Sequence, residues 1–276
     1  MDLLATTLEL AKLYDIHPSR SKGQNFLIDQ GVYEKIIAAA DIKKTDVVLE
    51  VGPGLGFLTV ELAKKARRVI AVELDDKLFK VLQTKLDSFD IKNIELVNQD
   101  ILRYQIQEPN YQIVANLPYN ITSIFLRTFL SSGHRPSSLV LLLQKEVAER
   151  LCATPPQMSV LAVSVQFYGD PKIIDLVPAA SFWPAPKVDS AIVKITLRKQ
   201  EYLSQNQEKP FFRLVKTGFS AKRKMIKNNL VGGLKIDAEI IERSIKECGL
   251  SPTQRAQELS LKDWLNLFAK LSPFMV

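Results

Sequence analysis

The chain of 276 residues has few of the side chains that build metal sites and disulfide frameworks. It holds two cysteines, Cys152 and Cys248, and two histidines, His17 and His134. These residues are far apart, and none of them shows the spacing of zinc ligands. We therefore expect neither a zinc site nor a disulfide framework, and we assign no metal to the protein.

Long apolar runs are also missing. No purely apolar run is longer than that of residues 139–143, which is far too short to cross a bilayer. The N-terminal residues MDLLATTLELAK lack the basic start of a secretory signal, and the chain shows neither repeats nor low complexity. We therefore expect a cytoplasmic globular protein with no membrane partner, and we expect it to be a monomer.

Positive charge is unevenly distributed. Of the net charge of +7, residues 200–276 contribute most, with 13 Lys and Arg against 8 Asp and Glu. Residues 1–199 hold 24 against 22. A basic region attached to a nearly neutral one suggests a polyanionic partner, although a solvated basic face without a partner gives the same composition.

Short β-branched runs alternate with helical stretches through the middle of the chain. The strands are expected at residues 46–51, 68–74, 93–100, 111–116 and 138–144. Strand, helix and strand in succession predict a parallel sheet that is covered on both faces. Two later strands, at 172–178 and 190–198, are expected to add an antiparallel edge. The fold class is therefore α/β, Rossmann-like.

Beyond the sheet, the pattern becomes entirely helical. Residues 201–209 are polar and are expected to form a linker, and helices are expected at 210–219, 238–249 and 261–271. We therefore predict two domains: residues 1–199, with an N-terminal helix to about Tyr14 and a second helix capped by Asp29, and a small basic helical domain of residues 200–276.

The first strand leads directly into EVGPGLG, with glycines at Gly52, Gly54 and Gly56. Glycine allows the backbone to turn sharply and to approach a ligand closely. A dinucleotide fingerprint would need its third glycine where Phe57 stands, so the loop does not match NAD or FAD. The spacing after an acidic strand end suits S-adenosylmethionine instead.

Acidic residues stand at successive strand ends. Glu73 is placed to bind a ribose diol through two charge-assisted hydrogen bonds, and Asp100 is placed to accept from the exocyclic amine of the cofactor's adenine. Glu50 is expected to support the loop backbone or the methionine end of the cofactor. Any one of these acids alone would be read as a cap or a solvated residue. Three acids beside a glycine loop favour the cofactor site.

The fourth strand ends in NLPY, next to the expected sulfonium. The side-chain carbonyl of Asn116 and the backbone carbonyl of Leu117 are placed to stabilise the charge that develops on an attacking adenine amine, and Pro118 fixes the turn. Tyr119 is a candidate to stack on a flipped-out base, and Phe182, held near prolines, is a candidate for its opposite face. Packing is the alternative role for both rings.

Eight stretches together resemble the ribosomal RNA adenine N6-dimethyltransferases, most closely the bacterial KsgA type. In chain order they are GQNFL (23–27), EVGPGLG (50–56), AVELD (71–75), NQD (98–100), NLPYN (116–120), FWPAPKVDSA (182–191), FSAKRKMIKNNL (219–230) and RAQELS (255–260). The resemblance covers nearly the whole chain, and the last two stretches favour this type over the Erm resistance enzymes.

The resemblance implies an S-adenosylmethionine-dependent enzyme that doubly methylates two adjacent adenosines near the 3′ end of small-subunit rRNA, in a hairpin loop, during ribosome assembly on a pre-30S particle. It implies cofactor contacts from Asn25, Leu27, Gly52, Glu73, Asp100 and Asn116. It also implies that residues 116–119 and Phe182 surround the target base. Within residues 219–230, at helical spacing, Lys222, Arg223, Lys224 and Lys227 are expected to contact RNA, whereas apolar residues face the core.

Three alternatives remain open at this level. An Erm-like enzyme would modify large-subunit rRNA. A protein-glutamine methyltransferase would use similar chemistry, but it typically has a second proline in place of Leu117. A checkpoint protein that binds the immature small subunit and methylates only incidentally would also suit the basic C-terminal region.

Overall fold

The computed structural model describes residues 2–19, 23–88, 91–118 and 120–275. The chain divides into two compact units. The first contains Met1–Ala148 and Asp170–Leu197, and the second contains Glu149–Gly169 and Arg198–Val276. The second unit thus includes a segment that precedes the last strands of the sheet. The division into two contiguous domains, 1–199 and 200–276, stays a prediction.

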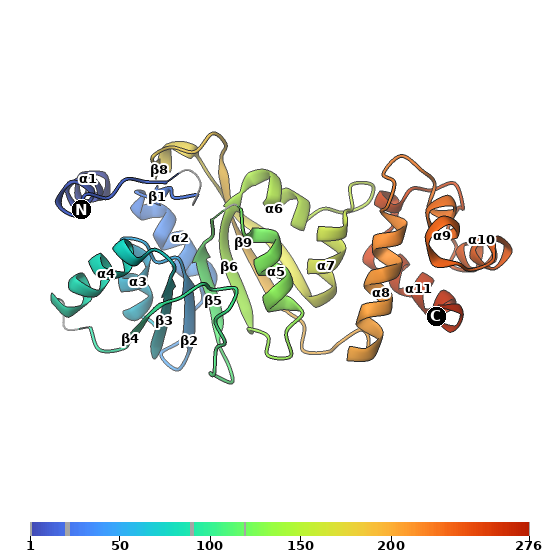
Figure 1. Cartoon of the computed structure of the whole chain (residues 1–276), viewed down its shortest axis with the longest axis horizontal. Coiled ribbons are helices and arrows are strands. Elements are labelled where there is room, and N and C mark those ends of the chain that lie inside the picture. The colour runs from blue at the N-terminus through green and yellow to red at the C-terminus, as the bar shows by residue number, and fades with distance from the viewer. Residues whose placement is uncertain (1, 20–22, 89–90, 119, 276) are drawn as a thin grey trace. The chain divides into compact units, whose positions relative to one another are not determined.

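The first unit is built on a seven-stranded sheet (Figure 1). Its strands are β2 (Val47–Val51), β3 (Arg68–Glu73), β4 (Ile94–Asn98), β5 (Gln112–Asn116), β6 (Ser138–Gln144), β7 (Gly169–Val177) and β9 (Ser190–Leu197). They lie in the order β4-β3-β2-β5-β6-β9-β7. The neighbours from β4 to β6 are parallel, and β9 is antiparallel to β6. The predicted parallel sheet with an antiparallel addition is confirmed.

Helices cover both faces of this sheet. The helices of the first unit are α1 (Leu3–Leu13), which lies beside the N-terminal loop, α2 (Gln30–Ala40), α3 (Phe57–Ala63), α4 (Asp76–Ser88), α5 (Thr122–Leu130) and α6 (Lys145–Leu151), the last of which ends in the second unit. On one face, Ile36 of α2 and Leu62 of α3 join Val48 and Val114 in a common core. Figure 1 shows α5 on the opposite face from α2. Strand β2 is therefore buried along its whole length, as central parallel strands are.

Acidic caps start two helices, and the one at Asp29 is predicted by the sequence. The Asp29 carboxylate accepts from the backbone N–H of Gly31 at 3.0 Å, and Asp75 accepts from the N–H of Lys77 at 3.0 Å. Each side chain satisfies amide donors that the first helical turn leaves unpaired. Asp75 thereby fixes the start of α4 directly after β3.

A small second sheet ties the N-terminal loop to a distant part of the chain. Strand β1 (Phe26–Leu27) pairs antiparallel with β8 (Phe182–Trp183), and Leu27 lies opposite Phe182. The rings of Phe26 and Trp183 stack with their centroids 6.3 Å apart. A short 3₁₀ turn, η1 (Ala179–Ser181), leads into β8. The FWPAPK segment is therefore more than a rigid link, because it also holds the GQNFL motif in place.

The second unit is helical. Its elements are α7 (Val160–Tyr168), α8 (Gln205–Gly218), α9 (Ile226–Leu234), α10 (Ala238–Glu247), η2 (Ala256–Glu258), α11 (Leu261–Leu271) and η3 (Ser272–Phe274). Trp264, Phe211 and Phe268 are fully buried in its core. The sequence assigned no element to residues 160–168.

The predicted linker at residues 201–209 is wrong from Gln205 onward. Ser204 and Gln207 form a capping box that starts α8 there, and Pro210 lies inside the helix. The polar composition and the proline suggested a linker. The same polar side chains, Ser204 and Gln207, instead pair with backbone amides that the first helical turn leaves without partners.

Candidate active site

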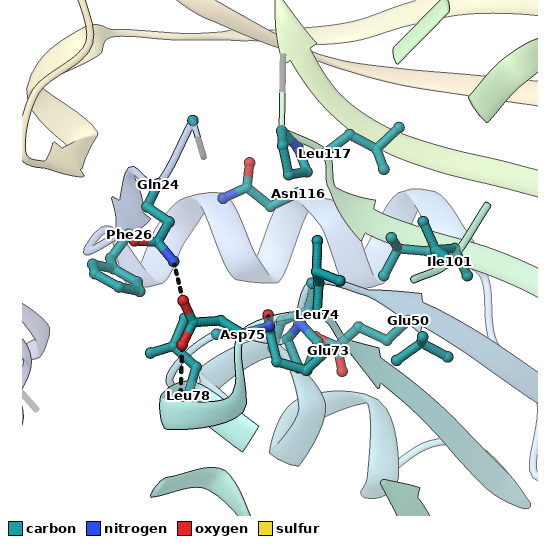
Figure 2. Close-up of a pocket in the computed structure, with 18 of the residues that line it drawn as sticks. Gln24, Phe26, Glu50, Glu73, Leu74, Asp75, Leu78, Ile101, Asn116 and Leu117 are labelled. Carbon is teal, nitrogen blue, oxygen red and sulfur yellow. Dashed lines mark hydrogen bonds between the residues drawn. The ribbon is translucent and has the colours of Figure 1, made fainter. Parts of the chain in front are cut away.

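A cavity of about 320 Å³ opens at the carboxyl ends of the parallel strands. The ends of β2, β3 and β5 supply its walls, together with the N-terminal loop and the start of α3 (Figure 2). Ligands of open α/β sheets bind at this edge, where loops rather than helices meet the strand ends. The cavity is therefore the candidate active site.

The glycine loop between β2 and α3 owes its shape to left-handed backbone conformations. Gly52 has φ of +65°, and a side chain built there would meet nothing within 4 Å, so the loop leaves open space on this side. Gly56 has φ of +76°, and a Cβ atom there would lie 2.2 Å from Leu82 of α4. At Gly52 only the left-handed backbone conformation requires glycine. At Gly56 the contact with Leu82 also excludes a larger side chain.

Glu73, at the end of β3, is held by the backbone around it. One carboxylate oxygen accepts from the N–H of Gly54 at 3.0 Å, and the other accepts from the N–H of Asp75 at 2.9 Å. The residue is 6% exposed. Burial raises the pKa of Glu73, and these backbone donors counteract the rise. Each oxygen keeps a second lone pair, so the carboxylate can still accept from a ligand hydroxyl.

Two further carboxylates lie at neighbouring strand ends. Asp100 is partly exposed, and one of its oxygens accepts from the N–H of Leu102 at 2.9 Å. Glu50, on β2, is 1% exposed, and its Oε2 has no hydrogen-bond partner among the described residues. Burial raises the pKa of Glu50 to about 8, and the nearby charge of Glu73 adds to the rise, whereas the Thr59 hydroxyl counteracts part of it. Asp100 and Glu50 therefore differ in how well the protein supports a negative charge.

The charge of the lining distinguishes between classes of ligand. Its described residues include four acids, Glu50, Glu73, Asp75 and Asp100, and neither lysine nor arginine. Such a lining repels the pyrophosphate of a dinucleotide and attracts a cation. Together with the open glycine loop and the unpaired oxygen of Glu50, it fits S-adenosylmethionine, which carries a sulfonium and an ammonium group.

Asn116, the last residue of β5, connects the sheet to the N-terminal loop. Its side-chain NH₂ donates to the carbonyl of Asn25 at 3.4 Å. Its side-chain oxygen keeps lone pairs that can accept from a substrate. Gln24 donates to the Asp75 carboxylate at 3.3 Å (Figure 2). The GQNFL loop therefore lies against two parts of the cavity wall.

Most of the predicted site residues line this cavity. They are Asn25, Leu27, Gly52, Gly54, Glu73, Asp100, Asn116, Leu117 and Pro118. Gly56 is not in the lining, because it starts α3 behind the loop. Tyr119 lies outside the described residues.

Phe182 does not line the cavity with the other predicted residues. Its ring is 3% exposed and belongs to the core beneath α2, and the residue is absent from the described lining. The pairing with Leu27 in the small sheet explains this burial. A stacking role for Phe182 stays a prediction, and it requires that β8 move when substrate binds.

The predicted RNA-binding residues differ in their surroundings. Lys222, Arg223 and Lys224 are exposed, whereas the ammonium of Lys227 pairs with Glu242. The pKa of Glu242 is lowered to about 2, mainly by its hydrogen bond to Lys227 and next by that to Lys246. We call residues 219–225 the basic loop.

The expectation of helical spacing across residues 219–230 is wrong for its first part. The basic loop consists of turns and bends, and α9 starts only at Ile226. The buried Asn229 explains the break, because its side-chain NH₂ donates to the carbonyls of Gly218 at 2.6 Å and Ala221 at 3.1 Å. These bonds hold the loop in a non-helical path and leave its three cations facing solvent.

Sequence reasoning missed several residues that line the cavity or support it. Gln24 and Asp75 stand inside motifs that were recognised, directly beside residues that were chosen, so adjacency is the signal that could have found them. Lys85 gave no signal. Its ammonium donates to the carbonyl of Leu55 at 2.9 Å from α4, and this contact depends on how the helix packs under the loop.

Two other kinds of site are absent from the described residues. No group of three or more His, Cys, Asp or Glu there has a geometry that could hold a metal ion. Nor is any helix in the same ranges long and apolar enough to cross a membrane.

Comparisons with known proteins agree with the geometry of the cavity. The family model of ribosomal RNA adenine dimethylase matches residues 17–272. A Dehalococcoides mccartyi protein named ribosomal RNA small subunit methyltransferase A is 44% identical over 270 residues, which cover 96% of this chain and 92% of that protein. A Clostridium perfringens protein of the same name is 36% identical, with 98% and 96% covered.

Solved structures give the same assignment. The chain resembles a dimethyladenosine transferase from Plasmodium falciparum with a TM-score of 0.77 and 27% identity, covering 90% of this chain and 98% of that one. It resembles the 23S rRNA methyltransferase ErmE with a TM-score of 0.76 and 29% identity, covering 90% and 100%. The chain therefore belongs to the ribosomal RNA adenine dimethylase family and is an S-adenosylmethionine-dependent methyltransferase.

Proposed function

We propose that this enzyme dimethylates the N6 positions of two adjacent adenosines in the 3′-terminal hairpin loop of small-subunit rRNA. The observation that carries the proposal is the meeting, in one cavity, of the acidic strand ends with Asn116 and Leu117. The relatives named for the small ribosomal subunit, at 36–44% identity, favour this target over the large-subunit target of ErmE.

Cofactor binding is assigned to the acidic side of the cavity. When bound, S-adenosylmethionine supplies a methyl group on a positively charged sulfur. The Glu73 carboxylate would accept hydrogen bonds from the ribose hydroxyl groups, and the Asp100 carboxylate would accept one from the exocyclic amine of the cofactor's adenine. Asn25, Leu27 and the open backbone at Gly52 complete the surface that excludes water from the reacting groups.

The residues at the end of β5 are assigned to the target base. Positive charge develops on the attacking amine in the transition state. The side-chain oxygen of Asn116 and the backbone carbonyl of Leu117 accept N–H bonds from that amine and stabilise the charge. Pro118 fixes the path of the chain after the strand, so that these acceptors are held before the substrate arrives. No strong base is required for this step.

The basic loop is assigned to the phosphates of the substrate RNA. Lys222, Arg223 and Lys224 are exposed, and Asn229 anchors the loop from beneath. Cations on an anchored loop lose less conformational entropy on binding than cations on a loose one. Lys227 contributes less, because its partner Glu242 already neutralises it. We further propose that the enzyme acts as a monomer on a pre-30S particle.

One experiment tests the target directly. Small subunits that lack the methylation are incubated with the enzyme and labelled cofactor, and the modified bases are then mapped. Label on two adjacent adenosines of the small-subunit hairpin is expected, and the Asn116→Ala variant is the matched control. Label confined to large-subunit RNA would support the Erm-like alternative. Tight binding of the particle with negligible turnover would support the checkpoint alternative.

A further inference from the structure

Glu50 occupies a position in which a charged carboxylate is poorly supported. Its side chain shares a face of β2 with Val48, and its partners on the neighbouring strands are Ala71 and Val114, neither of which has a polar side chain. Helices α2 and α3 cover this face. Among the described residues, the polar groups that face Glu50 are Tyr33 from α2, Thr59 from α3 and the carboxylate of Glu73 from β3.

None of these groups offers Glu50 a positive charge. The Tyr33 hydroxyl already donates to the carbonyl of Leu27 at 2.9 Å. The buried Thr59 hydroxyl lies near Glu50, but within the described structure it makes no hydrogen bond of ordinary geometry. Glu73 differs, because two backbone N–H groups hold its oxygens. A carboxylate buried without such donors is much more stable with its proton than without it.

The same carboxyl group lines the cavity that receives a cation. Glu50 and Glu73 both appear among its walls in Figure 2. We propose that Glu50 is a neutral acid in the cofactor-free protein and that it releases its proton to solvent when the positively charged cofactor binds. The inference rests on the cofactor assigned above. Its balance is simple: a cation enters, one proton leaves, and the net charge of the site is unchanged.

This coupling gives cofactor binding a defined pH dependence. Below pH of about 8, binding must remove a proton from Glu50, so the affinity should rise as the pH increases. Above this range Glu50 has already lost its proton, and its contribution to the pH dependence should disappear. The ammonium group of the cofactor also titrates, but its contribution is the same in every variant and cancels in a comparison.

Calorimetry of S-adenosylmethionine binding tests the inference. Titrations at pH 7 in two buffers with different ionisation enthalpies give the number of protons released per cofactor bound. The wild-type protein should release close to one proton more than Glu50→Gln. Because Gln resembles the protonated acid, the variant should fold, which a thermal melt will verify. Asp100→Asn, a change in a partly exposed acid of the same cavity, should weaken binding but keep the proton release of the wild type.

The outcomes separate this inference from the proposed function. Cofactor binding with equal proton release in wild type and Glu50→Gln overturns the inference and leaves the methyltransferase assignment intact. Absence of any S-adenosylmethionine binding by the wild-type protein overturns both the inference and the proposed function. The difference in log affinity between the wild type and Glu50→Gln across pH 6 to 9 gives a second check, and a difference that does not change with pH also overturns the inference.

Discussion

The two compact units place opposite charges on surfaces of different kinds. In the first unit, four acids line a cavity, and one of them, Glu50, is almost completely buried with an oxygen that lacks a partner among the described residues. In the second unit, the three cations Lys222, Arg223 and Lys224 stand exposed on the basic loop. Buried charges interact strongly over short distances, whereas exposed charges are screened by salt. The cavity is therefore suited to select a small cation, and the loop to attract a polyanion.

This difference predicts which measurement each substitution should change. Substitutions in the cavity should alter the rate or the cofactor affinity and leave the salt dependence of RNA binding intact. Substitutions in the basic loop should do the reverse. A residue that changes both would show that the two surfaces are not independent.

The largest effect is expected for Asn116→Ala. The side-chain oxygen is assigned to charge that exists mainly in the transition state, so single-turnover methyl transfer should fall about a hundred- to thousandfold. RNA affinity should change little. Asn116→Asp is a useful companion, because it keeps the acceptor but adds a charge beside the cofactor. A loss confined to RNA affinity, with the single-turnover rate intact, would contradict the assignment.

Glu73→Ala should weaken S-adenosylmethionine binding by about 2–3 kcal/mol, because a buried charged acceptor is lost. The same change also removes the acceptor of the Gly54 N–H, so part of the loss will come from the glycine loop. Glu73→Gln keeps one oxygen acceptor and should lose less. NAD should not compete with the cofactor in the wild type or in the variants, since no lysine or arginine is among the described residues of the lining. Unchanged cofactor affinity by calorimetry in a folded Glu73→Ala protein would exclude the proposed role.

Glu50→Gln should stabilise the cofactor-free protein in a pH-dependent way. The pKa of Glu50 rises from 4.5 to about 8 on folding, so the wild type loses stability as the pH rises through this range. The variant has no such group, and its advantage in the free energy of unfolding should grow by about 1.4 kcal/mol per pH unit between pH 5 and 8. Denaturant unfolding at several pH values measures this. A constant difference between the two proteins would mean that Glu50 is ionised throughout.

Much of the sheet and part of the cavity could be predicted from local patterns. The alternation of β-branched strands with amphipathic helices indicated the strands, and parallel strand ends must meet at one edge, which placed Glu73, Asp100 and Asn116 together. Asp29 was recognisable as a cap because capping is a local interaction.

What failed depends on interactions between distant residues. Nothing in the FWPAPK segment indicates that Phe182 lies opposite Leu27, some 155 residues earlier, and is buried by that pairing. The basic loop has helical spacing in its sequence, but hydrogen bonds from Asn229 hold it in another path. Whether a lysine is free or paired, as with Lys227 and Glu242, also depends on packing between helices.

The smallest effect is expected for the basic loop, where single phosphate interactions are weak and screened. Arg223→Ala combined with Lys224→Ala should reduce affinity for small subunits several-fold and should flatten the dependence of log affinity on log salt by roughly one unit for each phosphate interaction removed. Cofactor affinity should not change. Arg67→Ala with Arg68→Ala is the matched control: it removes the same charge from the first unit, where both guanidinium groups already pair with Glu108. We expect the control to keep the wild-type salt slope. If both double variants flatten the slope equally, exposure rather than free charge at the loop governs RNA binding, and the distinction drawn between the two surfaces is wrong.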